Sequence, residues 1–174
     1  MFTTNLLRCW REATREQRQS GADWYRRARL LVSALATRHG RTRSTVAGVV
    51  AATSPRLHWS RNVAVAGELL AGGAPRGVFG VNLEKAGRIL AGAKPLCVLC
   101  GNKVRAFYRA LLGDTGAAVI DVWMLRAAGA HDERPTDAVY ASIAEALRNL
   151  AKRLRISVTA LQATIWVAVR GRAE

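Results

Sequence analysis

Apolar residues recur at helical spacing along most of the 174-residue chain. Segment 22–38, for example, places Trp24, Ala28, Leu31 and Leu35 on one side of a helix, because residues three or four apart share a face. No alternating run is long enough for a sheet. The pattern predicts an all-α fold of about eight to ten helices. The expected helices are 1–19, 22–38, 45–53, 60–71, 82–91, one after Gly101, one after Asp121, one from Arg134-Pro135 to about residue 154, and 157–170.

Two features of the pattern predict how these helices are arranged. Segment 45–53 is almost wholly apolar, so we expect it to be central. The chain has the length of one domain, in which the N- and C-terminal helices pack together over one side of a cleft between helical layers. A break between helices is expected at Ser20-Gly21.

The chain is strongly basic, with 27 lysine and arginine residues against 12 acidic ones and a formal net charge of +15. Such a surface favours a polyanionic partner, and the excess of arginine suits forked contacts to phosphate. We therefore expect nucleic acid to be the partner. The alternative is the composition bias of a GC-rich genome, although that bias does not readily explain the shortage of acidic residues.

No apolar run approaches the roughly 20 residues of a membrane span, and no signal-peptide pattern opens the chain. We expect a soluble monomer that does not bind membranes, in the cytoplasm of a bacterium or a phage-infected host cell. Cys97 and Cys100 have C-x2-C spacing, but no second pair or nearby histidine completes a zinc site. We expect packed thiols, no metal and no cofactor.

Asp121 is the first candidate for chemistry. It follows the apolar run 117–120 and precedes a helix-compatible segment, so its carboxylate is expected to face an apolar cleft or to cap a helix. Aspartate is a favoured N-cap residue. Capping and catalysis both stay open from the local pattern, and the two roles can coexist.

Lys103 is the second candidate, because it follows Gly101 and Asn102 at the expected start of a helix. Backbone N–H groups are unpaired there, so main chain and side chain together can receive a phosphate. A desolvated lysine can instead act as an amine nucleophile. Phosphate contact, simple exposure and nucleophilic attack all stay open from these residues alone.

The loop 54–59 places an arginine, a histidine and a tryptophan close together, at Arg56, His58 and Trp59. Pro55 ends the preceding helix, because the residue before proline disfavours helical angles. At the mouth of a cleft, such a loop can wedge into a duplex and stack on bases. The alternative is a polar connection between helices with Trp59 packed against the core.

Gly101, Lys103, Asp121 eighteen residues later and Arg126 five residues after that resemble the core of the helix-hairpin-helix DNA glycosylases of the endonuclease III type. In that family the hairpin reads roughly L-P-G-V-G-x-K-T-A and is followed by V-D-T-H-x-x-R. The resemblance spans roughly residues 45–129. This chain departs from the motif at Leu99, Val104 and Val122-Trp123, which stand for the first hairpin glycine, a threonine and the Thr-His pair.

Segment 49–56, followed by Asn62 and Ala66, resembles the family's first core helix and its L-S-x-Q-T-x-D loop. Arg56 stands near a polar residue that in the family fills the gap left by an extruded base. The chain is also similar to small actinobacterial-phage proteins that carry S-P-Q-x-x-W-x-x-N and G-x-K-x-x-x-F-Y-R motifs.

The resemblance implies a helix-hairpin-helix glycosylase fold and a DNA glycosylase, with AP-lyase activity if Lys103 is the Schiff-base nucleophile. Asp121 would activate attack at the sugar. The implied partner is double-stranded DNA with a flipped base, and the expected DNA contacts come from Gly101, Asn102, Arg105, Arg56, His58, Trp59, Asn62 and Arg126.

Three alternatives stay open. The first is a phage enzyme that modifies an extruded base, as in thymine hypermodification. The second is a DNA-binding protein without catalysis on the same scaffold, which the departures from the motif favour. The third is an interaction module that binds a host factor.

Overall fold

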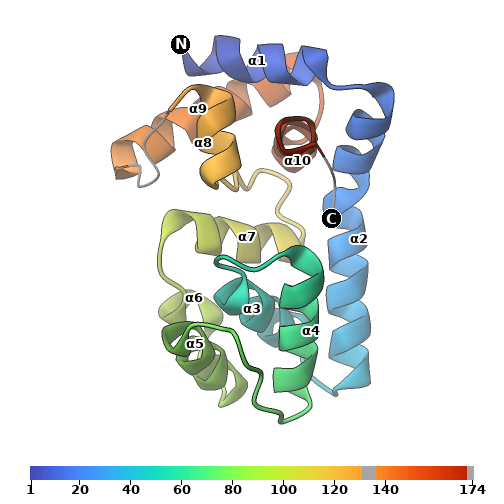
Figure 1. The fold of residues 1–174 in the computed structure, drawn as a ribbon, viewed down its shortest axis with the longest axis vertical. Coiled ribbons are helices and arrows are strands. Elements are labelled where there is room, and N and C mark those ends of the chain that lie inside the picture. Colours follow the sequence, from blue (N-terminus) through green and yellow to red (C-terminus); the bar gives the residue numbers. More distant parts are fainter. Residues whose placement is uncertain (131–135, 172–174) are drawn as a thin grey trace. The chain divides into compact units, whose positions relative to one another are not determined.

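The computed structural model describes residues 1–130 and 136–171, and these residues form helices and no strand (Figure 1). The all-α prediction is therefore confirmed. The helices of this described part are α1 (Phe2–Glu12), α2 (Arg15–Arg38), α3 (Arg43–Thr53), α4 (Trp59–Leu70), α5 (Gly80–Leu90), α6 (Pro95–Val98), α7 (Asn102–Leu112), α8 (Val122–Ala128), α9 (Asp137–Leu154) and α10 (Val158–Arg170). The helix start expected at Arg134-Pro135 lies outside the described residues.

The chain forms two compact units. Unit 1 comprises Met1–Arg27 and Gly113–Ala173, so it combines the two ends of the sequence. Unit 2 is the continuous segment Ala28–Leu112. The sequence predicts a single domain with a cleft between helical layers, and both the single domain and the cleft stay predictions.

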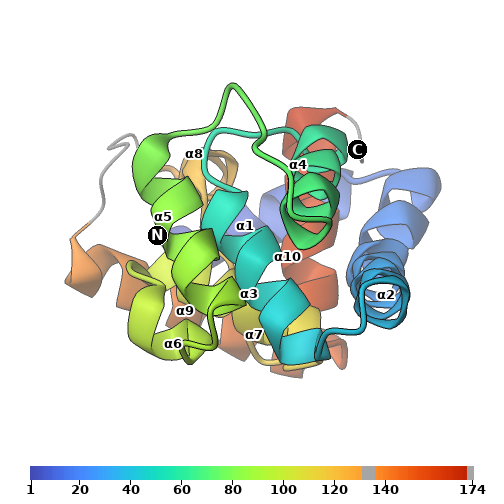
Figure 2. The ribbon, with the colours of Figure 1, turned by 90° about the horizontal axis from the view of Figure 1, so that it is seen from below.

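Unit 2 is built around α3, as the apolar pattern predicts. Every residue of α3 from Val46 to Thr53 is buried. The helix contacts α4, α5, α6 and α7, and Figure 2 shows α4 and α5 on its two sides. Gly48 permits the close approach of α6, because a Cβ at this position would lie 2.9 Å from Pro95 Cγ. The small residues of α3 thus let its neighbours pack tightly.

Unit 1 has its core where α1, α8, α9 and α10 meet (Figure 1). The first and last of these helices, α1 and α10, contact each other directly. Asn5 links α1 to the end of α8, because its Nδ2 donates a hydrogen bond to the Ala128 carbonyl at 2.9 Å. The largest fully buried side chains of this core are Leu6, Met124, Ile143, Leu147, Leu150, Leu161 and Ile165.

The N-terminal helical pattern is divided differently from the prediction. Instead of one helix to residue 19 and a break at Ser20-Gly21, α1 ends at Glu12 and α2 begins at Arg15. The side chains of Thr14 and Gln17 each accept a hydrogen bond from the other's backbone N–H, at 3.2 and 2.9 Å. This reciprocal cap fixes a helix start, and its Thr-x-x-Gln spacing is visible in the sequence.

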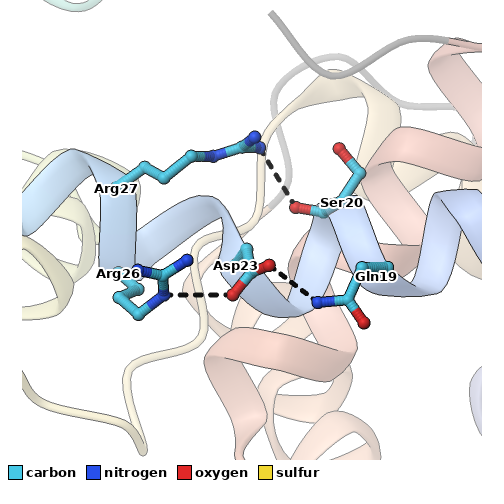
Figure 3. A network of polar contacts seen from close by, with 5 residues as sticks. All are labelled: Gln19, Ser20, Asp23, Arg26 and Arg27. Carbon is cyan, nitrogen blue, oxygen red and sulfur yellow. Dashed lines mark hydrogen bonds and ion pairs between the residues drawn. The ribbon is translucent and has the colours of Figure 1, made fainter.

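Gly21 lies inside α2 because unit 1 requires a residue without a side chain there. A Cβ at Gly21 would lie 2.5 Å from the backbone nitrogen of Thr164 in α10. Glycine weakens a helix interior, but polar contacts on the next turn support α2. Asp23 accepts hydrogen bonds from Gln19 at 2.7 Å and from Arg26 at 3.1 Å (Figure 3), at spacings that stabilise a helix.

Candidate functional site

Asp121 lies in unit 1 and is the N-cap of α8. Its Oδ1 accepts hydrogen bonds from the backbone N–H groups of Trp123 and Met124, both at 3.0 Å. Its Oδ2 accepts a hydrogen bond from the indole Nε1 of Trp166 in α10, at 2.9 Å. The capping role that the sequence left open is therefore confirmed, and both carboxylate oxygens are held in place.

The surroundings of Asp121 are apolar on the side of the preceding residues. The run 117–120 is buried, and its backbone is held by Tyr140. The Tyr140 hydroxyl donates to the Ala118 carbonyl at 2.7 Å and accepts from the Ile120 N–H at 3.3 Å. Burial raises the pKa of Tyr140 to about 12, and the negative charge of Asp121 acts in the same direction.

Tyr25 is a second buried phenol of unit 1. Its hydroxyl donates to Gln162 Oε1 at 3.1 Å, and the two residues are only 5% and 4% exposed. Burial raises the pKa of Tyr25, and the charge of Asp121 adds to the rise. Both phenols therefore stay neutral at physiological pH, so they give Asp121 polar but uncharged neighbours.

Trp166 contacts Asp121, and the sequence alone did not predict this role. Its spacing in the last helix predicts packing, and it is half-buried there. Its ring centroid lies 6.4 Å from that of Trp24, and the Arg170 guanidinium lies 4.8 Å from the Trp166 ring. Only the fold brings this indole N–H to Asp121, which is 45 residues away in the sequence.

Arg126 is exposed in the last turn of α8. Its guanidinium carbon lies 4.8 Å from the ring centroid of Trp123. A guanidinium that stacks on an indole keeps its hydrogen-bonding edge available for a phosphate. The geometry suits the predicted DNA contact, which stays a prediction.

The segment that was expected to form the hairpin lies in unit 2, between α6 and α7. Gly101 has a φ of +80°, in the left-handed region that favours glycine. Asn102 begins α7 and is exposed, and Lys103 follows it half-buried. The turn and the helix start therefore form where the local residues predict them, with Lys103 in the first turn of an 11-residue helix.

Arg105 braces this hairpin. Its Nε donates a hydrogen bond to the Leu99 carbonyl at 2.9 Å, and its Nη2 donates to the Leu96 carbonyl at 3.0 Å. Carbonyls at the end of a helix such as α6 lack intrahelical partners. Arg105 thus has a supporting role that the sequence did not predict, and its contact with DNA stays a prediction.

The loop before α4 makes a tight turn. The Leu57 N–H donates to the Ser54 carbonyl at 3.2 Å. Within this turn, Arg56 has a φ of +62°, a value that is uncommon for residues other than glycine. The Arg56 guanidinium lies 5.6 Å from the ring centroid of Phe79, which is 50% exposed. A cation and an aromatic ring are thus exposed together on unit 2.

His58 and Trp59 differ in their exposure. His58 is exposed and precedes α4 as its N-cap residue. Trp59 is half-buried, and its ring meets that of Phe107 edge to face with centroids 6.3 Å apart. Trp59 therefore follows the packed alternative, whereas the DNA contact of His58 stays a prediction.

Asn62 requires a correction. The residue is 1% exposed. Its Nδ2 donates to the Val50 carbonyl at 3.0 Å, and its Oδ1 accepts from the Thr53 hydroxyl at 2.6 Å. The prediction that Asn62 contacts DNA is wrong, because its amide is buried and joins α4 to α3 inside unit 2.

The two hairpin cysteines also differ from the prediction. Cys97 and Cys100 are exposed free thiols and are not packed, because the adjacent Val98 and Leu99 fill the interior instead.

Within residues 1–130 and 136–171, no group of three or more His, Cys, Asp or Glu side chains is placed to hold a metal ion. No helix in this part of the chain is long and apolar enough to cross a membrane.

The predicted site residues are divided between the two units. Asp121 and Arg126 belong to unit 1, and those of unit 2 are Arg56, His58, Trp59, Asn62, Gly101, Asn102, Lys103 and Arg105. The convergence of Lys103 with Asp121 in one pocket stays a prediction.

A family model matches almost the whole chain. It is described as "Family of unknown function (DUF7178)", and the match covers residues 1–173. No curated protein and no solved structure matches the sequence.

Proposed function

The chain belongs to the DUF7178 family, and we propose that it is a DNA-binding enzyme that acts on a base turned out of the duplex. The proposed reaction is that of a DNA glycosylase with AP-lyase activity through Lys103, on a helix-hairpin-helix glycosylase fold. The observation that carries the proposal is the carboxylate of Asp121, which three donors hold in one orientation beside a buried apolar run.

A carboxylate held in this way suits cleavage of a glycosidic bond. As the base departs with the bonding electrons, positive charge develops on the sugar. A negative group that is already oriented stabilises this charge without reorganising during the reaction. We assign this role, or activation of the nucleophile, to Asp121.

Lys103 is the proposed nucleophile. Its neutral amine attacks C1′ of the sugar, the bond from C1′ to the base breaks, and the base leaves with the electron pair and takes up a proton. The amine–sugar adduct then opens to a Schiff base, from which strand cleavage proceeds. The half-buried position of Lys103 in the first turn of α7 is the observation that supports this role.

Three observations support binding to duplex DNA. The formal net charge of +15 favours a polyanion. The turn at Gly101 leads into α7, whose first backbone N–H groups can receive a phosphate. The exposed pair of Arg56 and Phe79 suits insertion beside an unstacked base.

Borohydride trapping tests the proposed chemistry. Borohydride reduces a Schiff base between the protein and an abasic-site duplex to a stable amine, so a covalent product is seen on a denaturing gel. We expect trapping by the wild type, loss of trapping in Lys103→Ala, and unchanged trapping in Lys94→Ala, which removes a lysine that is exposed at the surface. No product from the wild type, or equal product from Lys103→Ala, would refute the lyase activity.

A DNA-binding protein without catalysis is the second candidate. It is favoured because capping of α8 and the bond from Trp166 account for both oxygens of Asp121. The Asp121→Asn variant distinguishes the two candidate functions. A DNA glycosylase would lose base excision but keep its affinity for DNA, whereas for a protein that only binds DNA the wild type would show no base excision either. A base-modifying enzyme would use the same groups, and mass spectrometry of nucleosides from treated DNA would show an altered base instead of a released one.

A further inference from the structure

Six of the described helices end in the same way, whereas α1, α3, α6 and α9 do not. Among the described residues, a glycine with positive φ follows α2, α4, α5, α7, α8 and α10, at Gly40, Gly72, Gly92, Gly113, Gly129 and Gly171. The residue after α9 is Arg155, with a φ of +56°. In the same described part, Arg155 and Arg56 are the non-glycine residues with positive φ.

The cap at Arg155 has the hydrogen bonds of a glycine cap. The Ile156 N–H donates to the Ala151 carbonyl at 3.1 Å. The glycine cap at Gly129, at the end of α8, has the equivalent bond, in which the Ala130 N–H donates to the carbonyl of residue 125 at 2.9 Å. A Cβ destabilises this left-handed conformation. Glycine would therefore hold the position of Arg155 with less strain.

Arg155 continues a positively charged surface at the C-terminal end of α9. Arg148, Lys152 and Arg153 are exposed beside it. In the part of the chain that the structure describes, none of these four side chains forms an ion pair. Lys152 and Arg153 have a local explanation, since cations in the last turn stabilise a helix. Arg155, the C-cap residue, can interact with the same helix end, but its own backbone conformation is unfavourable.

We infer that Arg155 contacts a phosphate of bound duplex DNA, together with Lys152, as a backbone contact of unit 1. The inference rests on the proposed DNA-binding function. A guanidinium matches the oxygens of a phosphate with two parallel hydrogen bonds. Strained backbone conformations cluster at functional sites, so the outlier at Arg155 directs attention to its side chain. The contact adds affinity without reading the sequence.

Two substitutions separate the charge of Arg155 from its backbone strain. Arg155→Gly and Arg155→Ala remove the same charge, but only the glycine variant relieves the strain. We expect the melting temperature of Arg155→Gly to rise by about 1–3 °C and that of Arg155→Ala to stay within about 1 °C of the wild type. Arg155→Lys keeps both the charge and the strain.

Fluorescence anisotropy with a labelled duplex of about 20 base pairs measures the DNA contact. In about 0.1 M salt, Arg155→Gly and Arg155→Ala are expected to bind roughly 3- to 10-fold more weakly than the wild type, and Arg155→Lys nearly as well. The slope of log affinity against log salt falls by about 0.9 in both neutral variants. The charge control is Arg8→Gln on α1 of the same unit, where we expect a loss below about twofold.

The outcomes distinguish this inference from the function on which it rests. Wild-type affinity in both neutral variants, or an equal loss in Arg8→Gln, overturns the role of Arg155 and leaves the proposed function standing. If the wild type does not bind the duplex, both the role of Arg155 and the proposed function are overturned.

Discussion

The hydrogen bond from Trp166 to Asp121 makes a contribution to the stability of unit 1 that one substitution can measure. Replacing it with phenylalanine removes the indole N–H that donates to Asp121 Oδ2 at 2.9 Å. Hydrogen bonds to charged groups contribute more than neutral ones. We expect Trp166→Phe to lower the free energy of unfolding by about 1–2 kcal/mol in urea titrations at pH 7.

Trp123→Phe is the matched control for this prediction. It changes another tryptophan beside Asp121 but leaves all three hydrogen bonds in place, because Trp123 donates through its backbone N–H. Equal stability of Trp166→Phe and Trp123→Phe would show that the indole bond does not stabilise unit 1.

Tyr140 gives the stability of the protein a defined dependence on pH. Its pKa is raised to about 12 in the folded state, chiefly by burial, whereas an unfolded tyrosine titrates near 10. The unfolded state therefore loses its proton first, and stability falls as pH rises from about 10 to 12. Relative to Tyr140→Phe, which cannot ionise, the wild type should lose about 1 kcal/mol between about pH 9 and 11.

Urea titrations of both proteins at these pH values measure the difference, and the other titrating groups affect the two proteins alike. Parallel curves for the wild type and Tyr140→Phe would mean that the phenol is not buried in the folded state.

Single residues also show which parts of the site the sequence could predict. The cap at Asp121 and the turn at Gly101 depend on a few neighbouring residues, so local patterns predicted both. The partners of Asn62, Arg105 and Trp166 depend on how helices pack. The sequence therefore predicted a DNA contact for Asn62, whose amide is buried, and missed the bond from Arg105 to Leu99. It also predicted only packing for Trp166, whose indole N–H binds Asp121.

Among the elements, the crossing of α2 with α10 depends on one small residue. Gly21→Ala places a Cβ 2.5 Å from the Thr164 nitrogen, so the helices must separate. We expect a loss of about 1–3 kcal/mol in the free energy of unfolding. Gly87→Ala in α5 is the matched control, because a Cβ there meets nothing within 4 Å. It should stabilise the protein by up to about 1 kcal/mol.

Denaturant titrations of the two variants compare these effects directly. A Gly21→Ala variant as stable as Gly87→Ala would contradict the close approach of α2 and α10.

Helix positions were more predictable than helix boundaries. The buried centre at α3 follows from an uninterrupted apolar run, and the extents of α4, α5 and α10 follow from periodicity within one or two residues. The boundary between α1 and α2 was misplaced because Gly21 looks like a helix end in sequence. Its reason for being glycine is a contact with a helix some 140 residues further along the chain.

For the whole molecule, the dominant property is its excess of positive charge, a formal net charge of +15. In the described part of the chain, the turn at Gly101 before α7 is exposed in unit 2, and the basic C-terminal end of α9 is exposed in unit 1. A net charge of +15 favours a polyanionic partner. The net charge can be read from the sequence, whereas the structure is needed to show which basic side chains are exposed, such as those at the end of α9.

A salt titration of duplex affinity tests whether this charge serves DNA binding or reflects composition alone. Four phosphate contacts require a slope of about −3.6 in a plot of log affinity against log salt, roughly a 150-fold loss between 50 and 200 mM. Phe79→Ala is an informative variant, because it removes the exposed ring beside Arg56 without changing charge. We expect it to weaken binding roughly 5- to 10-fold, by loss of base stacking, at an unchanged slope. A flat salt dependence would instead assign the basic surface to composition, because phosphate contacts cannot form without releasing counterions.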